Sequence, residues 1–73
     1  MSKESKAWTL TDGTQQVVFQ PYNNSYTTLT SPTSPGTING IRFDSPAHKV
    51  VLTTESARTT WNELRESGWE AQN

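Results

Sequence analysis

Cysteine is absent from this 73-residue sequence, and histidine occurs once, at His48. Disulfide bonds and thiolate metal sites are therefore excluded, and one imidazole is too few for a histidine-based structural metal site. We expect neither a metal nor a cofactor. Domains this short usually need a disulfide, a metal ion or a partner subunit to be stable. Association with a second copy or with a larger assembly is therefore the expected source of additional stability.

Apolar residues are also scarce, at 30% of the chain, against about 45–50% in ordinary globular domains. Disordered chains with such a composition usually have a high net charge and few aromatic residues. This chain has a net charge of −1 with three tryptophans, two tyrosines and two phenylalanines. Much of its polarity comes from threonine, which favours strands. We predict a single β-rich domain over residues 1–73, in which the polar residues 1–6 form a frayed tail.

The sequence has no long apolar run and no excess of positive charge. No segment approaches the ~18 apolar residues of a transmembrane helix, so we expect no membrane partner. No apolar stretch typical of a signal peptide follows Lys3 and Lys6. We therefore expect a cytoplasmic location, in a bacterium or in a phage-infected cell. The pI of 5.6 argues against a protein that binds nucleic acid mainly through its phosphates.

Alternating apolar and polar residues predict strands through most of residues 7–53. The predicted strands cover residues 7–11, 15–20, 22–30, 37–44 and 48–53. Asp12-Gly13 predicts a hairpin turn between the first two strands, and Pro21 ends the second. Residues 31–36 contain two prolines and a glycine and predict a loop. Asn39-Gly40 is either a hairpin turn or a bulge within the fourth strand.

Two of these strands also carry predictions about their place in the sheet. Residues 22–30 are polar on both faces, which favours an edge strand. Val50, Val51 and Leu52 are consecutive and predict a central strand covered on both faces, or a strand covered by the helix on one face and by a partner on the other. In the second case Val51 is the residue expected to face the partner.

Residues 54–69 predict one short amphipathic helix packed on the sheet. Thr53 or Thr54 is the expected N-cap, and Gly68 is expected to end the helix in a left-handed conformation. The apolar residues that should clamp the helix to the sheet are Ala57, Trp61, Leu64 and Trp69. The expected fold class is therefore α+β, a small antiparallel sheet of four to five strands followed by one C-terminal helix.

The residues that carry chemistry do not form a catalytic pattern. The carboxylates fall in the tail, in turns, or on and beyond the predicted helix, where each has an ordinary structural role. Ser45 is three residues from His48, a spacing that matches no catalytic motif. The glycines are scattered and build no phosphate-binding loop. We therefore expect that the protein is not an enzyme.

Binding is the remaining class of function, and the aromatic residues of the predicted sheet are its best candidates. The leading hypothesis is an accessory protein-interaction module that binds itself or a larger assembly. A single-stranded nucleic-acid binder is the alternative, with Arg42 and Lys49 facing each other across the turn at 44–47. A minor structural component of a virion, suggested by the Thr/Ser-rich composition, is the third. The candidate binding residues are Trp8, Phe19, Tyr22, Tyr26, Arg42, Lys49 and Val51.

The C-terminal residues form a recognisable pattern of acid, Ala-Arg, Trp, Leu and Gly-Trp. The matching residues are Glu55, Ala57, Arg58, Trp61, Leu64, Gly68 and Trp69. The pattern resembles the ending of small uncharacterised proteins of marine cyanobacteria and their phages. It spans about a fifth of the chain, and it implies a source rather than an activity. In layout alone, the order of elements resembles transcriptional coactivator domains that bind single-stranded DNA and dimerise through a C-terminal helix.

Overall fold

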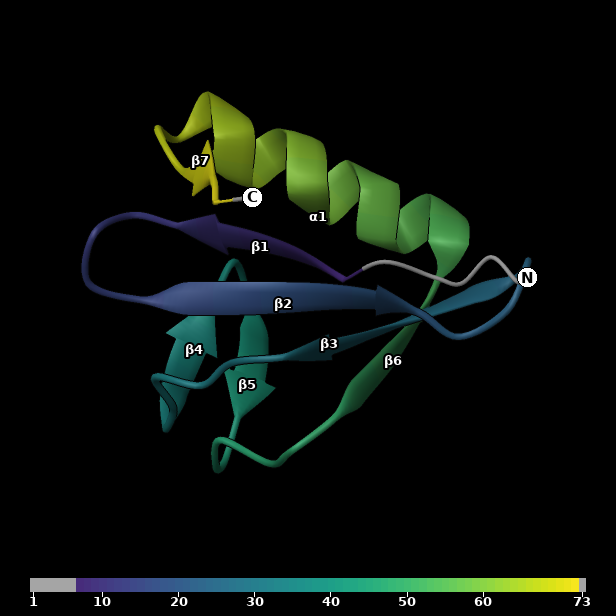
Figure 1. Cartoon of the computed structure of the whole chain (residues 1–73), viewed down its shortest axis with the longest axis horizontal. Helices are drawn as coiled ribbons and strands as arrows, with labels where there is room; N and C mark the ends of the chain where they lie inside the picture. Colours follow the sequence, from purple (N-terminus) through teal and green to yellow (C-terminus); the bar gives the residue numbers. More distant parts are fainter. Residues whose placement is uncertain (1–6, 73) are drawn as a thin grey trace.

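A computed structural model describes residues 7–72 and contains seven strands and one helix among them (Figure 1). In chain order the elements are β1 (Trp8–Thr11), β2 (Gln16–Pro21), β3 (Tyr26–Thr30), β4 (Gly36–Ile38), β5 (Ile41–Phe43), β6 (Val50–Thr53), α1 (Thr54–Glu66) and β7 (Glu70–Ala71). The predicted α+β class is confirmed. The frayed tail predicted for residues 1–6 lies outside the described residues.

The turn between β1 and β2 is held by the side chain of Asp12. Its Oδ1 atom accepts hydrogen bonds from the backbone N–H groups of Gln15 (2.7 Å) and Thr14 (2.8 Å). Gly13 has a φ of +97°, a conformation that glycine adopts without steric cost. The two N–H groups, Gln15 foremost, favour the charged carboxylate and hold the pKa of Asp12 below its ordinary value of 3.8.

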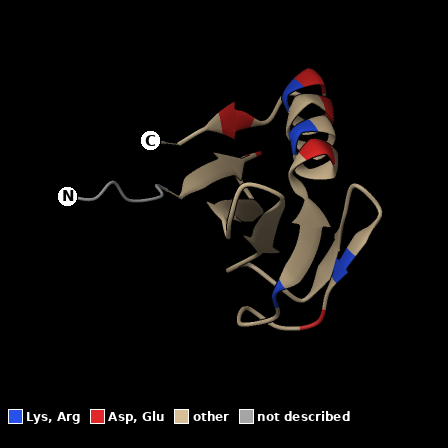
Figure 2. Ribbon diagram, turned by 90° about the vertical axis from the view of Figure 1, so that its right-hand side faces the viewer, with Lys and Arg blue, Asp and Glu red and all other residues tan. Residues whose placement is uncertain are grey.

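The main sheet has the strand order β6-β3-β2-β1-β7, and every neighbouring pair is antiparallel. Leu10 lies opposite Val17, and Phe19 lies opposite Leu29, so the four side chains share one face of the sheet. All four are almost completely buried. We call this the inner face. Figure 2 shows α1 and the β4–β5 hairpin on the same side of the sheet, where both supply residues to the core.

The other face of the sheet, the outer face, is rich in threonine. Val18 lies there between Thr9 of β1 and Thr30 of β3, and Thr28 lies opposite Val51. These side chains are partly or largely exposed. The outer-face threonines, among them Thr9, Thr28 and Thr30, thus supply strand propensity on a face that does not contribute to the core.

The edge position predicted for residues 22–30 is wrong, and so is the first of the two alternatives for residues 48–53, a central strand. β3 is not an edge strand, because it pairs with both β2 and β6. Its threonines mark an open face rather than a free edge. β6 is not central, because among the described residues it pairs only with β3 and ends the sheet. Within its apolar run, Val50 and Leu52 turn towards the inner face, whereas Val51 is 59% exposed.

Residues 36–43 form a separate two-stranded hairpin rather than one continuous strand. Ile38 lies opposite Ile41, with Asn39 and Gly40 between them. Both turn residues have positive φ, +52° and +83°, as in a type I′ turn. Of the two alternatives for Asn39-Gly40, the hairpin turn is therefore correct. Phe43 is fully buried and seats the hairpin in the core.

The two caps of α1 follow the sequence closely, although the helix is shorter than predicted. Thr53 is the N-cap, and its Oγ1 atom accepts a hydrogen bond from the N–H of Ser56 (3.1 Å). Gly68 has a φ of +101°, and the N–H of Trp69 donates to the carbonyl of Leu64 (3.0 Å). This is a Schellman motif, which ends the helix at Glu66 instead of Trp69.

The buried stripe of α1 differs from the predicted clamp in one position. Ala57, Thr60 and Leu64 are buried, and Trp69 is buried beyond the helix end. Trp61 is only partly buried and packs edge-on against Phe19, with ring centroids 5.2 Å apart. Thr60 takes the central place because it lies between Ala57 and Leu64 at helical spacing.

The chain returns to the sheet after the helix, which the sequence analysis missed. Ala71 and Glu70 of β7 pair with Leu10 and Thr11 of β1. A strand of two residues has no periodicity of its own to reveal it. The pairing covers the edge of β1 that would otherwise be open.

We expect Asp12 to make the stability of the protein depend on pH in acid. Its lowered pKa stabilises the fold above about pH 3.8, and this contribution is lost as the pH falls through the folded-state pKa. Urea unfolding at about pH 7 and about pH 2.5 should therefore show Asp12→Asn losing less stability than the wild type on acidification. Asparagine keeps an acceptor oxygen but has no charge to lose. Equal losses in both proteins would contradict this role.

We expect the stability of the C-terminal cap to depend on whether the residue at position 68 can adopt a positive φ. A Cβ built on Gly68 meets no atom within 4 Å, so substitution there tests backbone conformation alone. Gly68→Ala should destabilise the protein by about 1–2 kcal/mol, because an L-residue is strained at positive φ. D-alanine at the same position, introduced by chemical synthesis, should leave stability unchanged or raise it. Equal urea midpoints for the two alanines would show that the cap does not depend on φ.

Candidate protein-interaction groove

A groove of about 480 Å³ opens between the first half of α1 and the adjacent end of the main sheet. Its wall is formed by residues of the paired strands β1, β2 and β3, of the β2–β3 turn and of α1. Its lining residues are Trp8, Phe19, Pro21, Asn23, Asn24, Thr27, Thr54, Ala57, Arg58 and Trp61. We call this hollow the aromatic groove.

The aromatic side of the groove follows from the register of β1 and β2. Trp8 lies opposite Phe19, and Pro21 is two residues further along the same face as Phe19. Trp61 reaches this group from the helix and contacts Phe19 in a T-shaped arrangement. Phe19 is 3% exposed and forms the floor, whereas Trp8 is 43% exposed and forms the outer wall.

The polar side of the groove is built by the β2–β3 turn and the start of α1. Asn23 Oδ1 accepts hydrogen bonds from the N–H groups of Ser25 (2.7 Å) and Tyr26 (2.9 Å). The N–H of Thr54 donates to the carbonyl of Ser25 (2.8 Å), and its hydroxyl donates to the carbonyl of Asn24 (3.4 Å). The turn and the helix are therefore fastened to each other, and the wall they form is rigid.

In the part of the chain that the structure describes, Arg58 is the one charged residue that lines the groove. It is exposed, and within residues 7–72 it belongs to no ion pair. Glu55, the carboxylate nearest to it along the helix, lines a different hollow. Although the whole chain carries a net charge of −1, the charge that the described residues place in the groove lining is positive.

That second hollow lies on the opposite flank of α1, towards the β4–β5 hairpin, and has a volume of about 530 Å³. Glu55 and Glu63 are its charged residues. Asn39 donates a hydrogen bond from Nδ2 to Glu63 Oε1 (2.8 Å), which ties the hairpin turn to the helix. In the described part of the chain, no three carboxylate, imidazole or thiol groups gather as metal ligands would.

The structure brings together two of the residues proposed from the sequence and separates the others. Trp8 and Phe19 meet in the groove. Tyr22 follows Pro21 and is 74% exposed, outside the groove lining. Tyr26 and Val51 lie together on the outer face, because Tyr26 pairs with Thr53 and Val51 with Thr28.

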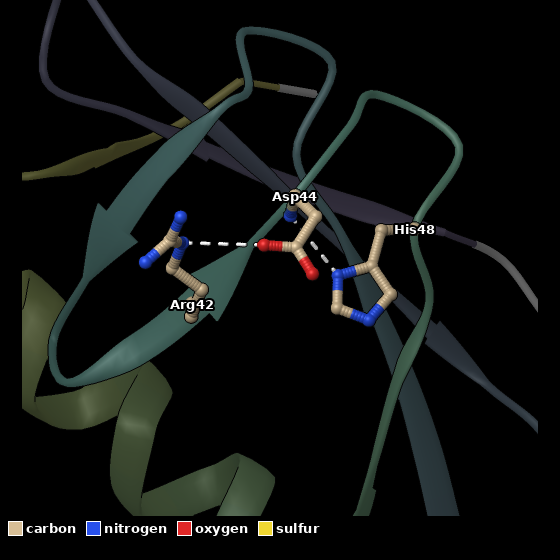
Figure 3. Close-up of polar contacts among 3 residues, drawn as sticks. All are labelled: Arg42, Asp44 and His48. Carbon is tan, nitrogen blue, oxygen red and sulfur yellow. Dashed lines mark hydrogen bonds and ion pairs between the residues drawn. The ribbon is translucent and has the colours of Figure 1, made fainter.

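Arg42 and Lys49 are remote from the aromatic groove. Arg42 Nε forms an ion pair with Asp44 Oδ1 at 3.2 Å, and the N–H of Asp44 donates to His48 Nδ1 at 3.1 Å (Figure 3). These contacts hold the connection from β5 to β6. Arg42, one of the two cations expected across the turn, is thus paired with Asp44. Figure 2 shows the described cations divided between α1 and the opposite end of the fold.

Sequence reasoning missed Arg58 and Trp61 as groove residues. Arg58 enters the sequence analysis only as part of the C-terminal pattern, and Trp61 as part of the clamp. The two are three positions apart, so they are neighbours on one flank of the helix, beside the buried stripe. A cation and a partly buried tryptophan on the same flank are the signal that could have indicated a groove.

Comparison with protein-family models, with curated proteins and with solved structures finds no match. Among the described residues, α1 is too short and too polar to cross a lipid bilayer.

We expect mutations in the groove to separate residues that hold the fold from residues that only line the groove. Phe19→Ala should cost about 3–5 kcal/mol of unfolding free energy, because it empties a buried site. Trp8→Ala should cost about 1 kcal/mol or less, since much of its side chain already contacts water. Urea titrations monitored by circular dichroism would measure both. A larger loss for Trp8→Ala than for Phe19→Ala would contradict this division.

Proposed function

We propose that this protein is a non-enzymatic protein-interaction module whose aromatic groove receives a segment of a protein partner. The observation that carries the proposal is the pair of accessible tryptophans, Trp8 and Trp61, held beside Phe19 on rigid elements. Tryptophan is the most typical anchor residue of protein interfaces. Concave sites lined by aromatic residues and a few polar groups are typical of binding.

The surface area supports docking rather than completion of an unfinished core. The protein exposes 4696 Å², close to the ~4,500 Å² expected for a compact monomer of its mass. The core residues of the sheet, hairpin and helix are buried without a second chain. We therefore favour a foreign partner over self-association, and expect a solution mass near 8.2 kDa.

The positions of the charges support a protein partner over a nucleic acid. Single-stranded nucleic-acid sites combine aromatic platforms with a positively charged track for the backbone. Among residues 7–72, Arg58 is the only cation that lines the groove, and Arg42 and Lys49 are not among its lining residues. The proposal that the protein is not an enzyme is supported by the structural hydrogen bonds of Asp12, Asp44 and His48.

The C-terminal resemblance supports, within the same proposal, a cyanobacterial or phage source, and we propose the cytoplasm as the place of action. It does not bear on the identity of the partner. The groove can be tested without knowing the partner, because it should select peptides by itself.

Panning a library of random heptapeptides against the immobilised protein tests this function. Clones enriched on the wild type should lose about tenfold or more of their binding on Trp8→Ser. They should bind Val51→Ser normally, since Val51 is an exposed apolar residue on the outer face and serves as the matched control. Clones that bind both variants like the wild type, or no enrichment at all, would reject the proposal.

A further inference from the structure

We infer that the aromatic groove recognises an acidic peptide segment, in which an aromatic or large apolar side chain lies next to a carboxylate. This inference rests on the proposed function and names the chemistry of the partner. It follows from three properties of the described groove: its apolar floor, its free hydrogen-bond donors and the positive charge of Arg58.

The apolar floor fits one large side chain. Phe19 and Trp61 already form a T-shaped pair with ring planes at 79°, and Trp8 and Pro21 complete the wall around them. An added aromatic ring extends such a cluster favourably, because ring edges and faces carry opposite partial charge. The volume of about 480 Å³ lies at the small end of the range for ligand sites. It therefore suits an anchor side chain with its flanking backbone.

Some hydrogen-bonding groups at the rim of the groove already have partners within the protein, and others are free. Two acceptors on the polar wall, Asn23 Oδ1 and the carbonyl of Asn24, are already engaged by groups of the β2–β3 turn and of Thr54. The donors are not engaged: within residues 7–72, no hydrogen bond is made by the indole N–H of Trp8 or Trp61, or by Arg58. These free donors can bind an acceptor of a ligand, such as a carboxylate oxygen or a peptide carbonyl.

The charge points to the same class of ligand. Arg58 is exposed at the groove, and among residues 7–72 no carboxylate lines the groove; Glu55, three residues earlier on the helix, lines the other hollow. A guanidinium binds a carboxylate through two parallel N–H···O bonds, a geometry that a neutral amide cannot reproduce. A nucleic acid would require further cations along its path, whereas the other described cations lie at the far end of the fold or in the last turn of α1 (Figure 2). A peptide with one carboxylate next to one large apolar side chain therefore matches the groove, which has one arginine beside one apolar floor.

The experiment uses the full chain labelled with ¹⁵N and follows its three indole N–H signals. The probe is the tripeptide acetyl-Glu-Phe-Asp-amide. Its controls are acetyl-Gln-Phe-Asn-amide, which lacks charge, acetyl-Glu-Ala-Asp-amide, which lacks the anchor, and an oligothymidine octamer. Trp8 and Trp61 report on the groove, while Trp69 is buried at the other end of the helix and is an internal reference.

The acidic aromatic probe should shift the Trp8 and Trp61 signals saturably, with a Kd of about 1 mM, and leave Trp69 in place. The neutral and the alanine peptides should bind about fivefold more weakly or worse. Arg58→Gln should reduce binding of the acidic probe to that of the neutral one. Arg65→Gln should have no effect, because it removes the same charge from the last turn of the same helix, outside the groove.

Several results would overturn the inference. Equal binding of the neutral peptide, or unchanged binding by Arg58→Gln, would show that no carboxylate is recognised. Stronger shifts with the oligothymidine would assign the groove to nucleic acid. If selected heptapeptides bind the groove but the acidic probe does not, the inference fails and the proposed function stands. If neither binds, both fail.

Discussion

The register of β2 against its two neighbours is the constraint on which the rest of the structure depends. Opposite residues share a face, so the pairing of Phe19 with Trp8 on one side and with Leu29 on the other places three large side chains together. A slip of one residue would bury the threonine face and expose the core. The tight turn at Asp12 fixes this register, and the core and the aromatic groove both follow from it.

The local features of the fold could be predicted because each depends on a few adjacent residues. Local backbone preferences of single residue types explain these features: the helix caps at Thr53 and Gly68 and the turn at Asp12. Strand order could not be predicted in the same way. The threonines of β3 and the valines of β6 report which faces are wet, but exposure of a face is independent of whether both edges of the strand are paired.

The candidate site was predictable only in the part that lies within one hairpin. Trp8 and Phe19 are neighbours through β1–β2 pairing, so sequence patterning finds them together. Arg58 and Trp61 join them because the helix crosses the end of the sheet, a placement that depends on how Thr60 and Leu64 pack. The helical periodicity predicts that Trp61 is a core residue. Only the packing of its ring against Phe19 in the structure shows that part of the ring stays accessible.

The short strand β7 links the two ends of the described chain in a single ladder. Leu10 of β1 pairs with Ala71 of β7 on its second side, and Trp69, two residues before Ala71 in the sequence, is part of the core. During synthesis on the ribosome, the nascent chain must therefore hold β1 with one edge open until almost all of the described sequence has emerged. Closing this edge brings together residues from the two ends of the described chain, a contact of high sequence separation whose loop-closure entropy must be overcome.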